Sequence, residues 1–365
     1  MTLRDDLLCL IHDGCGVRDF SLRAAKAVSR SVGFDGVAVL TMDPATSLVT
    51  SAFVQNGLPA DATARIIEIE HREGDVNTFA ALARSGRLAA SLHLETHGEL
   101  ERSLRHRELR APIGLGDELR TVLVSASATW GALTLGRAAG STPFSAAEVA
   151  LMASLSRHLA EGLRRAVLLT ALTTRQTQRS AGLALLTDDN SIAAADASAE
   201  AWLAELRTDT ALPPVIAAVA SQARSVAAGG AGTLARARIQ TSTGAWVTVR
   251  GSVLDGHTAV MIEPARPHEL APLIADAYEL TARERIVVQL VAQGLRSEAI
   301  AETLHLSSWT VQDHLKAVFE KVGVSSRGEL VARIFFTHHP PRLESQEPGM
   351  AGPSHLPHPL ANERT

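Results

Sequence analysis

The segment from Leu280 to Phe336 carries the signals that most constrain the fold of this chain. Its apolar residues recur three and four positions apart, which is typical of short helices that bury one face. Thr281 and Glu284 have the spacing of a capping box at the start of the first helix. Gly294 and Gly323 stand where helices would end, because glycine adopts a positive φ without strain. We therefore predict four short helices.

The other three helices are expected to begin at serines. Ser297 is predicted to cap the second helix, and Ser307 or Ser308 the third. Ser326 and Glu329 form another capping box that opens the fourth helix. A short helix, a tight turn and a second helix with a polar outer face make a helix-turn-helix unit. The third helix would then enter the major groove of DNA with its N-terminal half leading.

The outward face of the third helix carries the side chains expected to contact DNA. Thr310 and Gln312 can form hydrogen bonds with base edges or phosphates, and Lys316 can pair with a phosphate. The predicted DNA-binding residues are Ser297, Ser308, Trp309, Thr310, Gln312, Asp313, His314, Lys316, Lys321 and Arg327.

The charge of this segment is low for a DNA-binding unit. It holds seven Lys or Arg residues against six Asp or Glu residues. This near-neutrality and the negative charge of Asp313 favour an alternative, a sensory or scaffold protein that acts through protein–protein contacts. The spacing of the helix signals favours DNA binding.

A set of residues at fixed spacing runs through the segment: Leu280, Thr281, Arg283, Glu284, Gly294, Ile300, Ala301, Leu304, Ser307, Thr310, Val311, His314, Lys321, Val324 and Arg327. This set resembles the LuxR-type (GerE-type) helix-turn-helix family. The resemblance implies a transcription regulator that binds DNA as a dimer. Gln312 stands where the family usually has Lys or Arg, so the operator sequence stays open.

Residues 1–170 alternate helical and strand-like stretches. Two hairpins are predicted, one from Gly36–Asp43 and Leu48–Asn56, the other from Leu119–Ser127 and Trp130–Arg137 with its turn at Ala128-Thr129. A polar, helix-leaning stretch separates the hairpins. This order indicates an α+β fold with an antiparallel sheet.

A long helix is predicted to follow, opened by the capping box of Ser145 and Glu148. Its apolar stripe consists of Val149, Met152, Leu155, Leu159, Leu163, Val167 and Leu168. We expect this stripe to form a dimer seam. The alternative is that it packs on the sheet of its own chain.

Three motifs carry a second resemblance: Gly36-Val37-Ala38, Trp130-Gly131-Ala132-Leu133 and the run Thr142–Arg164. They are similar to GAF domains, which implies a sensory module. Some GAF domains bind small molecules between the sheet and the helical insert. No residue set here specifies a ligand, so a small-molecule effector and a ligand-free module that dimerises both stay open.

Residues 180–265 predict a second α+β unit. A strand at Leu183–Asp189 and two helices precede three strands at Ala235–Thr241, Trp246–Leu254 and His257–Glu263. This order resembles a PAS domain, although Asp196 stands where Asn is common. We expect this unit to bind no ligand.

Composition and missing motifs exclude several classes of protein. The net charge of −4 over 365 residues means that any DNA contact must be local. Cys9 and Cys15 are too few for a disulfide framework and suit a cytoplasmic protein, and no signal peptide or membrane span is expected. His93 and His97 lack the HExxH order of a zinc site, and no phosphate-binding loop is present. No enzyme activity, cofactor or metal is predicted.

The sequence thus predicts α+β sensory modules followed by an all-α, four-helix DNA-binding domain. We expect domains at residues 1–170, 180–265 and 275–337, and a disordered tail at 340–365. The expected protein is a homodimeric transcriptional regulator that reads a pseudo-palindromic operator in double-stranded DNA through the helix at 307–321.

Overall fold

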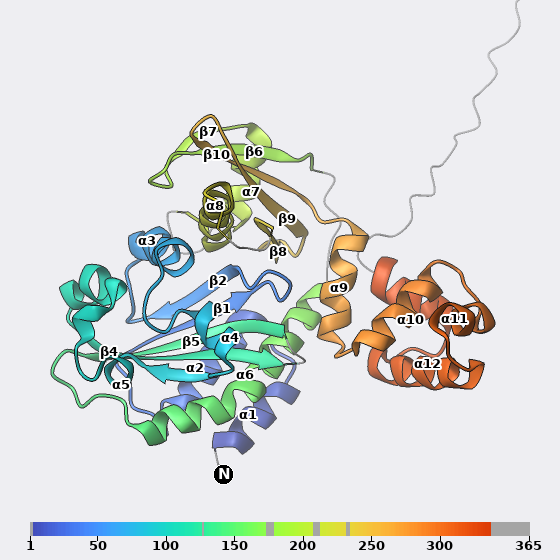
Figure 1. Cartoon of the computed structure of the whole chain (residues 1–365), viewed down its shortest axis with the longest axis horizontal. Helices are drawn as coiled ribbons and strands as arrows, with labels where there is room; N and C mark the ends of the chain where they lie inside the picture. Colours follow the sequence, from blue (N-terminus) through green and yellow to red (C-terminus); the bar gives the residue numbers. More distant parts are fainter. Residues whose placement is uncertain (1–2, 126–127, 173–178, 207–211, 231–233, 337–365) are drawn as a thin grey trace, which may run out of the picture.

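The structure is a computed structural model, and it describes residues 3–125, 128–172, 179–206, 212–230 and 234–336. Two antiparallel sheets of five strands with their helices precede a helical C-terminal unit, which confirms the predicted fold class (Figure 1). None of the described helices is both long and apolar enough to span a membrane. The predicted tail at 340–365 lies outside the described residues.

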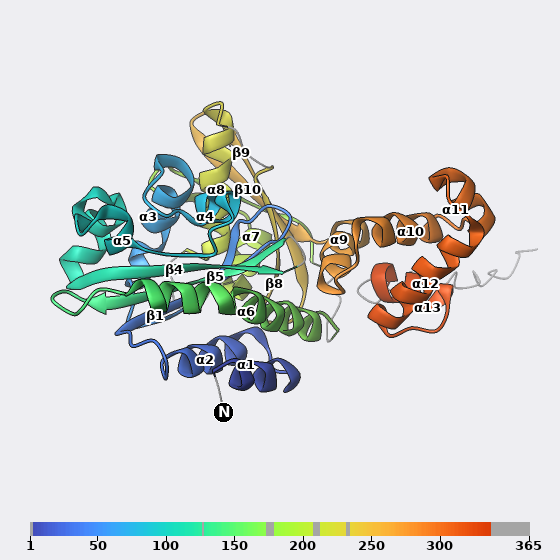
Figure 2. The same ribbon diagram turned by 60° about the horizontal axis from the view of Figure 1, so that its bottom comes forward.

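The first sheet has the strand order β2-β1-β5-β4-β3. Its strands are β1 (Gly36–Met42), β2 (Val49–Gln55), β3 (Ala89–Ser91), β4 (Leu115–Ser125) and β5 (Ala128–Ala138). Figure 2 shows three helices below this sheet: α1 (Leu3–His12), α2 (Val17–Val28) and α6 (Ala146–Leu172). On its other side lie α3 (Thr63–Glu68), α4 (Phe79–Ser85), α5 (Leu92–Thr96) and the short segments η1 (Ala60–Ala62), η2 (Ile69–Glu73), η3 (Leu100–Arg102), η4 (His106–Arg110) and η5 (Ala111–Ile113).

Both predicted hairpins form, but the second turn was placed wrongly. Ala128 and Thr129 belong to β5, where they pair with Ser125 and Val124. The antiparallel ladder therefore continues through the two residues that were expected to turn. The edge strand β3 was not predicted, because three residues are too few to show an alternating pattern.

The stripe on α6 packs inside its own chain, so the predicted dimer seam is wrong for its central residues. The capping box forms as expected: Ser145 Oγ accepts from the amide of Glu148, and Glu148 Oε2 accepts from the amide of Ser145 at 2.8 Å. The central residues of the stripe are buried against the first sheet, α1 and α2; they are Met152, Leu155, Leu159 and Leu163. Val167 is half-buried, and Leu168 has no described side chain.

The second sheet, β7-β6-β10-β9-β8, repeats the strand order of the first. Its elements are β6 (Gly182–Leu186), β7 (Ile192–Ala195), α7 (Ala197–Leu206), α8 (Pro214–Ala227), β8 (Arg236–Gln240), β9 (Trp246–Leu254) and β10 (His257–Pro264). The predicted order of strands and helices is present, with β7 in addition. The likeness to PAS domains stays a prediction.

Helix α8 lies between the two sheets and joins their cores. Each residue from Pro214 to Arg224 is buried, so the helix is covered on all sides. One continuous apolar cluster contains Val215 and Val219 of α8, Val49 and Val122 of the first sheet, and Val249 of the second. The two α+β units therefore share a hydrophobic core.

A helix that was not predicted, α9 (Pro267–Ala277), connects the second sheet to the C-terminal unit. That unit consists of α10 (Ala282–Ala292), α11 (Ser297–Leu304), α12 (Ser308–Val322), α13 (Arg327–Val331) and η6 (Ala332–Phe336). Leu270 and Ile274 of α9 share an apolar cluster with the C-terminal helices, Trp130 of β5 and Trp246 of β9. Both sheets thus contribute an indole ring to the core of the helical unit.

A buried ion pair connects the two sheets and α9. Arg238 of β8 donates from Nε to Asp43 Oδ2 at 2.9 Å and from NH2 to Asp43 Oδ1 at 2.5 Å, just beyond β1. Its third donor, NH1, reaches the carbonyl oxygen of Glu269 in α9 at 2.6 Å. Both charged side chains are 2% exposed.

We predict that Gly131→Ala destabilises the protein by about 1–3 kcal/mol, the usual cost of overpacking a dense core. A Cβ at position 131 would lie 2.2 Å from the backbone oxygen of Leu40 in the neighbouring strand, which cannot move aside alone. Urea denaturation monitored by circular dichroism measures the change. Gly328→Ala is the matched control, because a Cβ there meets nothing within 4 Å. Equal stability of the two variants would contradict the packing described for β5.

Candidate nucleic-acid interface

The four predicted helices of the C-terminal unit are present as α10 to α13. Their packed faces carry Val287, Ile300, Leu315 and Leu330, each at most 2% exposed. A small apolar core therefore fixes the positions of α11 and α12 relative to each other.

Most of the predicted start and stop signals are confirmed. Thr281 and Glu284 form the capping box of α10. Ser307, one of the two serines considered, caps α12, and its Oγ accepts from the amide of Thr310 at 3.0 Å. Gly323 ends α12 with a φ of 70°. Ser326 caps α13, but the carboxylate of Glu329 accepts from Ser325.

The turn between α11 and α12 is fixed by a residue with positive φ. His305 ends α11 in the left-handed conformation, with a φ of 52°. The amide of Leu306 then donates to the carbonyl oxygen of Ala301 at 2.9 Å. This turn directs the chain into the Ser307 cap and sets the angle at which α12 leaves α11.

Ser297 does not cap α11 as predicted. The cap position is Arg296, and the Ser297 side chain is buried and turned toward α12. Ser297 Oγ accepts from Gln312 Nε2 at 2.8 Å and from Arg327 NH2 at 2.6 Å. Arg327 also donates from NH1 to the carbonyl oxygen of Leu295 at 2.9 Å. Ser297 and Arg327 therefore support the interface from inside the unit.

Lys321 also has partners within the protein. Its Nζ lies 2.7 Å from Glu284 Oε2 and 3.2 Å from the carbonyl oxygen of Glu279, so it ties α12 to the start of α10. Burial raises the pKa of Glu284, but hydrogen bonds from Lys321 and Thr281 outweigh it and lower the pKa below its usual value. The stability from this carboxylate is present above its unfolded pKa and is lost as the pH falls through the folded pKa.

The remaining predicted DNA-binding residues lie on the accessible side of α12. Ser308, Trp309, Gln312, Asp313 and Lys316 are exposed, and Thr310 and His314 are partly exposed. The indole of Trp309 is 74% exposed, an unusual position for a large apolar side chain. These residues occupy the first two-thirds of α12.

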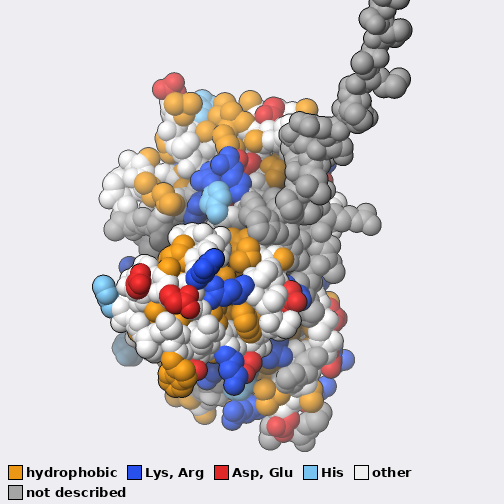
Figure 3. Space-filling view, turned by 90° about the vertical axis from the view of Figure 1, so that its right-hand side faces the viewer, with side chains coloured by type: hydrophobic (Ala, Val, Ile, Leu, Met, Phe, Trp, Pro, Cys, Tyr) orange, Lys and Arg blue, Asp and Glu red, His pale blue; other side chains and the backbone are white. Residues whose placement is uncertain are grey.

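The side chains of two cations of the unit, Lys316 and Arg296, have neither an ion pair nor a hydrogen bond in the part of the chain that is described. Lys316 projects from α12, and Arg296 stands at the N-terminus of α11. Arg296 was not among the predicted DNA-binding residues. Its position directly before the predicted start of α11 could have indicated a phosphate contact. Figure 3 shows the side of the molecule that holds the C-terminal unit, with Lys and Arg side chains near its middle and Asp and Glu on either side.

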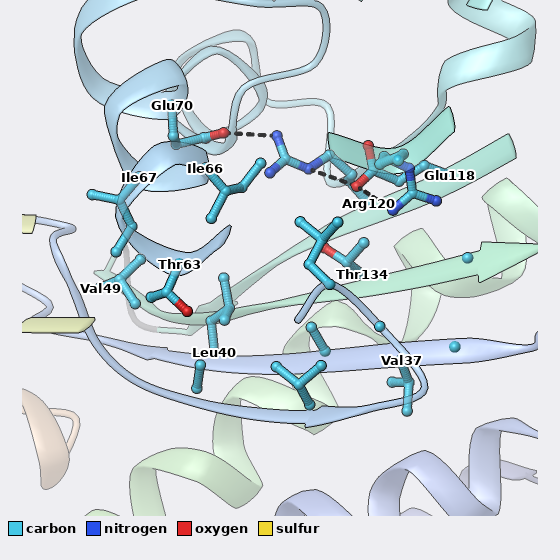
Figure 4. A pocket seen from close by; sticks show the side chains of 18 of the residues that line it. Val37, Leu40, Val49, Thr63, Ile66, Ile67, Glu70, Glu118, Arg120 and Thr134 are labelled. Atoms are coloured by element: carbon cyan, nitrogen blue, oxygen red, sulfur yellow. Dashed lines mark hydrogen bonds and ion pairs between the residues drawn. The ribbon is translucent and has the colours of Figure 1, made fainter. Parts of the chain in front are cut away.

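The first α+β unit holds a separate cavity of about 120 Å³. Figure 4 shows Leu40 of β1 facing Ile66 and Ile67 of α3 across it, with Glu118 and Arg120 at one end. Arg120 NH1 pairs there with Glu70 Oε2 at 2.9 Å.

Glu118 is charged at the polar end of this cavity. Burial raises its pKa, but Arg105, Arg110 and Arg120 outweigh that effect and lower the pKa well below the usual value. Among the described residues, no group of three or more His, Cys, Asp or Glu side chains could hold a metal ion.

Comparison with known proteins places the C-terminal unit. The family described as bacterial regulatory proteins, luxR family (GerE), matches residues 278–334. The transcriptional regulatory protein DesR of Bacillus subtilis is 36% identical over 67 residues, which are 18% of this chain and 34% of DesR. The monoamine regulon transcriptional regulator of Klebsiella aerogenes is 44% identical over 54 residues, 15% of this chain and 24% of that protein.

The solved structures that match the first unit include GAF domains. One is the GAF domain/HD domain protein from Geobacter sulfurreducens, which is 19% identical and covers 44% of this chain and 91% of its own, with a TM-score of 0.27.

The chain spans about a third or less of the length of the curated relatives it matches. The family match falls on the C-terminal unit, where the helix signals of the sequence also lie. Residues 278–334 therefore form a LuxR-type helix-turn-helix domain of the bacterial regulatory proteins.

Proposed function

We propose that the protein is a transcription regulator that binds double-stranded DNA in the cytoplasm by placing α12 in the major groove. The observation that carries this proposal is the division of α12 into two faces. Val311, Leu315 and Val318 are buried in the unit, while Gln312 and Lys316 on the other side are exposed. A fixed helix with a free polar face can contact base edges without rearrangement.

A DNA titration at two salt concentrations tests the proposal. Phosphate contacts make the affinity for DNA fall steeply with salt, because counterions are released on binding. A salt-dependent, sequence-selective affinity for fragments of genomic DNA is the expected result. Binding that shows neither property would favour the alternative of a scaffold that contacts other proteins.

Lys316→Gln should weaken binding to all DNA sequences and reduce the slope of log affinity against log salt by about 1, the effect of losing one phosphate contact. Lys321→Gln is the matched comparison, because Lys321 is engaged with Glu284. It should lower the free energy of unfolding by about 1–3 kcal/mol, the usual worth of hydrogen bonds to a charged group, although the Thr281 amide still donates to Glu284. Fluorescence anisotropy and urea denaturation measure the two effects. A slope change with Lys321→Gln equal to that with Lys316→Gln would show that Lys321 also contacts DNA.

The proposed regulator acts as a homodimer. One α12 reads one half-site, and a two-fold pair would read two half-sites about one helical turn, roughly 34 Å, apart. The operator should then be pseudo-palindromic. Because the central α6 stripe is buried in its own chain, the proposed dimer must use another surface.

We propose that the two α+β units control the DNA-binding domain through Glu279, at the junction of α9 and α10. Its Oε1 accepts from Ser125 Oγ of β4 at 3.2 Å and lies 3.6 Å from Arg164 NH2 of α6. Its carbonyl oxygen accepts from Lys321 of α12. One residue thus touches both the first unit and the helix proposed to read DNA.

Glu279→Ala should loosen this contact and speed hydrogen exchange in α9 and at the end of β4. The ion pair of Glu279 and Arg164 is partly exposed, so we expect it to contribute about 0.2–1 kcal/mol. Its loss should therefore raise the exchange rate by up to about fivefold. Mass spectrometry of exchanged peptides provides the measurement. Glu298→Ala serves as control, because Glu298 is exposed and has no side-chain partner in the described chain. The same exchange in both variants would argue against Glu279 as a connection.

The cavity of the first unit is the proposed site for a small-molecule effector. Its apolar wall and charged end suit a small molecule with an apolar body and one polar group. A panel of short-chain and aromatic carboxylates, amides and alcohols would be screened by thermal unfolding. A ligand at a hundred times its Kd should stabilise the fold by about 2.7 kcal/mol.

Ala38→Phe should abolish such stabilisation, because Ala38 lines the cavity and is only partly buried. The larger ring fills space that the ligand would need. A shift in unfolding temperature that survives in Ala38→Phe would place the ligand elsewhere.

A further inference from the structure

A second cavity, of about 660 Å³, lies where the two sheets and α9 meet. This junction cavity is lined by residues of β1 and β2 in the first sheet, by residues of β8 and β9 in the second, and by Leu273 of α9 (Figure 1). Its volume lies within the range of about 300–1,000 Å³ that is typical of small-molecule sites. Among the described residues, it shares only Ala52 and Pro214 with the smaller cavity beside α3. The two cavities are therefore distinct.

Most of the side chains that line the junction cavity offer no hydrogen bond to a ligand. The apolar ones include Val39, Met42, Phe53, Leu206, Ile239 and Leu273. The hydroxyl groups are engaged with one another, since Thr41 Oγ1 lies 2.7 Å from both Thr50 Oγ1 and Ser51 Oγ. The lining therefore suits a largely apolar molecule.

Two buried indole groups on this lining have unused donors. Trp130 and Trp246 are 2% and 8% exposed, and neither Nε1 has a hydrogen-bond partner among the described residues. By contrast, Trp202 Nε1 donates to the carbonyl oxygen of Ser180 at 3.0 Å. A buried indole N–H usually has a partner, and an exception calls for an explanation such as a bound molecule. Both exceptions border the same cavity, so an acceptor from outside the chain would satisfy them there.

The charged side chains of the lining favour an uncharged ligand. Arg238 and Asp43 are each 2% exposed and neutralise one another. Glu205 is already in an ion pair, and the exposed neighbours Arg18 and Asp19 have opposite signs. No buried cation of the described lining is thus left to compensate an anion, and a carboxylate beside the two indoles would lose its hydration without gaining a charged partner.

We propose that the junction cavity binds an uncharged, largely apolar molecule that presents carbonyl oxygen to the indole N–H groups of Trp130 and Trp246. Ordered water would also satisfy these donors. A ligand that replaces the water with its own acceptor and buries apolar surface gains affinity in addition. This inference goes beyond the proposed function and does not depend on it, because the binding is measured without DNA.

The test is a titration of the full chain with 2-octanone, followed by proton–nitrogen NMR of its four indole groups. Trp130→Phe and Trp246→Phe, which each lack one signal, identify the two that matter. The ketone should move these two signals to lower field. The signals of Trp202 and Trp309 should stay in place, because Trp202 already has a partner and Trp309 is exposed on α12. Each Phe variant keeps an aromatic ring but loses the donor, so its affinity for 2-octanone should fall by about two- to tenfold.

Two matched ligands test the chemical class. In 2-methyl-1-octene a CH2 group replaces the carbonyl oxygen, and octanoate has a similar length but carries a negative charge. Both should bind about fivefold more weakly than 2-octanone, or weaker still.

Three results would overturn the inference. Equal affinity for the alkene would show that the oxygen is not recognised, and tighter binding of octanoate would refute the uncharged class. If neither indole signal moved with 2-octanone, water alone would be the partner of the two donors. A thermal melt checks that the Phe variants fold, and the spectra of the unchanged protein decide the question where a variant does not.

Discussion

The buried pair of Arg238 and Asp43 is the interaction on which the arrangement of the whole molecule depends. It joins the first sheet to the second, and the third donor of Arg238 holds α9. Charged groups removed from water are costly unless paired with good geometry, and losing one partner leaves an uncompensated charge. The guanidinium has its acceptors only when all three parts are in place. The contact therefore favours one relative placement of the sheets and α9 over others of similar apolar burial.

The apolar cores reinforce this placement. Helix α8 is covered on all sides, and its many alanines let both sheets approach it closely. Trp130 and Trp246 extend the cores of the two sheets into that of α9 and the DNA-binding domain. Apolar burial supplies most of the stability of such an assembly, but it is not directional. The buried ion pair and the contacts of Glu279 require a defined geometry, so they specify how the units are oriented relative to one another.

Signals between residues close in the sequence predicted the helix ends correctly. They did not predict which side chains distant in the sequence would contact each other. The caps at Thr281, Ser307 and Gly323 depend on residues three or four positions away, so their spacing could be recognised. Ser297, like the capping serines, is a serine at the start of a helical pattern, but its hydrogen-bond partners lie 15 and 30 residues away in the sequence. Lys321 matched a family position, yet the structure pairs it with Glu284. The α6 stripe was recognised correctly as apolar, but periodicity does not say which surface covers it.

The continuity of α8 with both sheets has a consequence for engineering. A chimeric regulator is usually built by exchanging one input module for another at the linker between them. Here a cut between the two sheets would divide a single hydrophobic core and expose the apolar faces of α8 on one fragment and of β2 on the other. A transferable cassette of this protein would thus comprise both α+β units together, since they fold around one core.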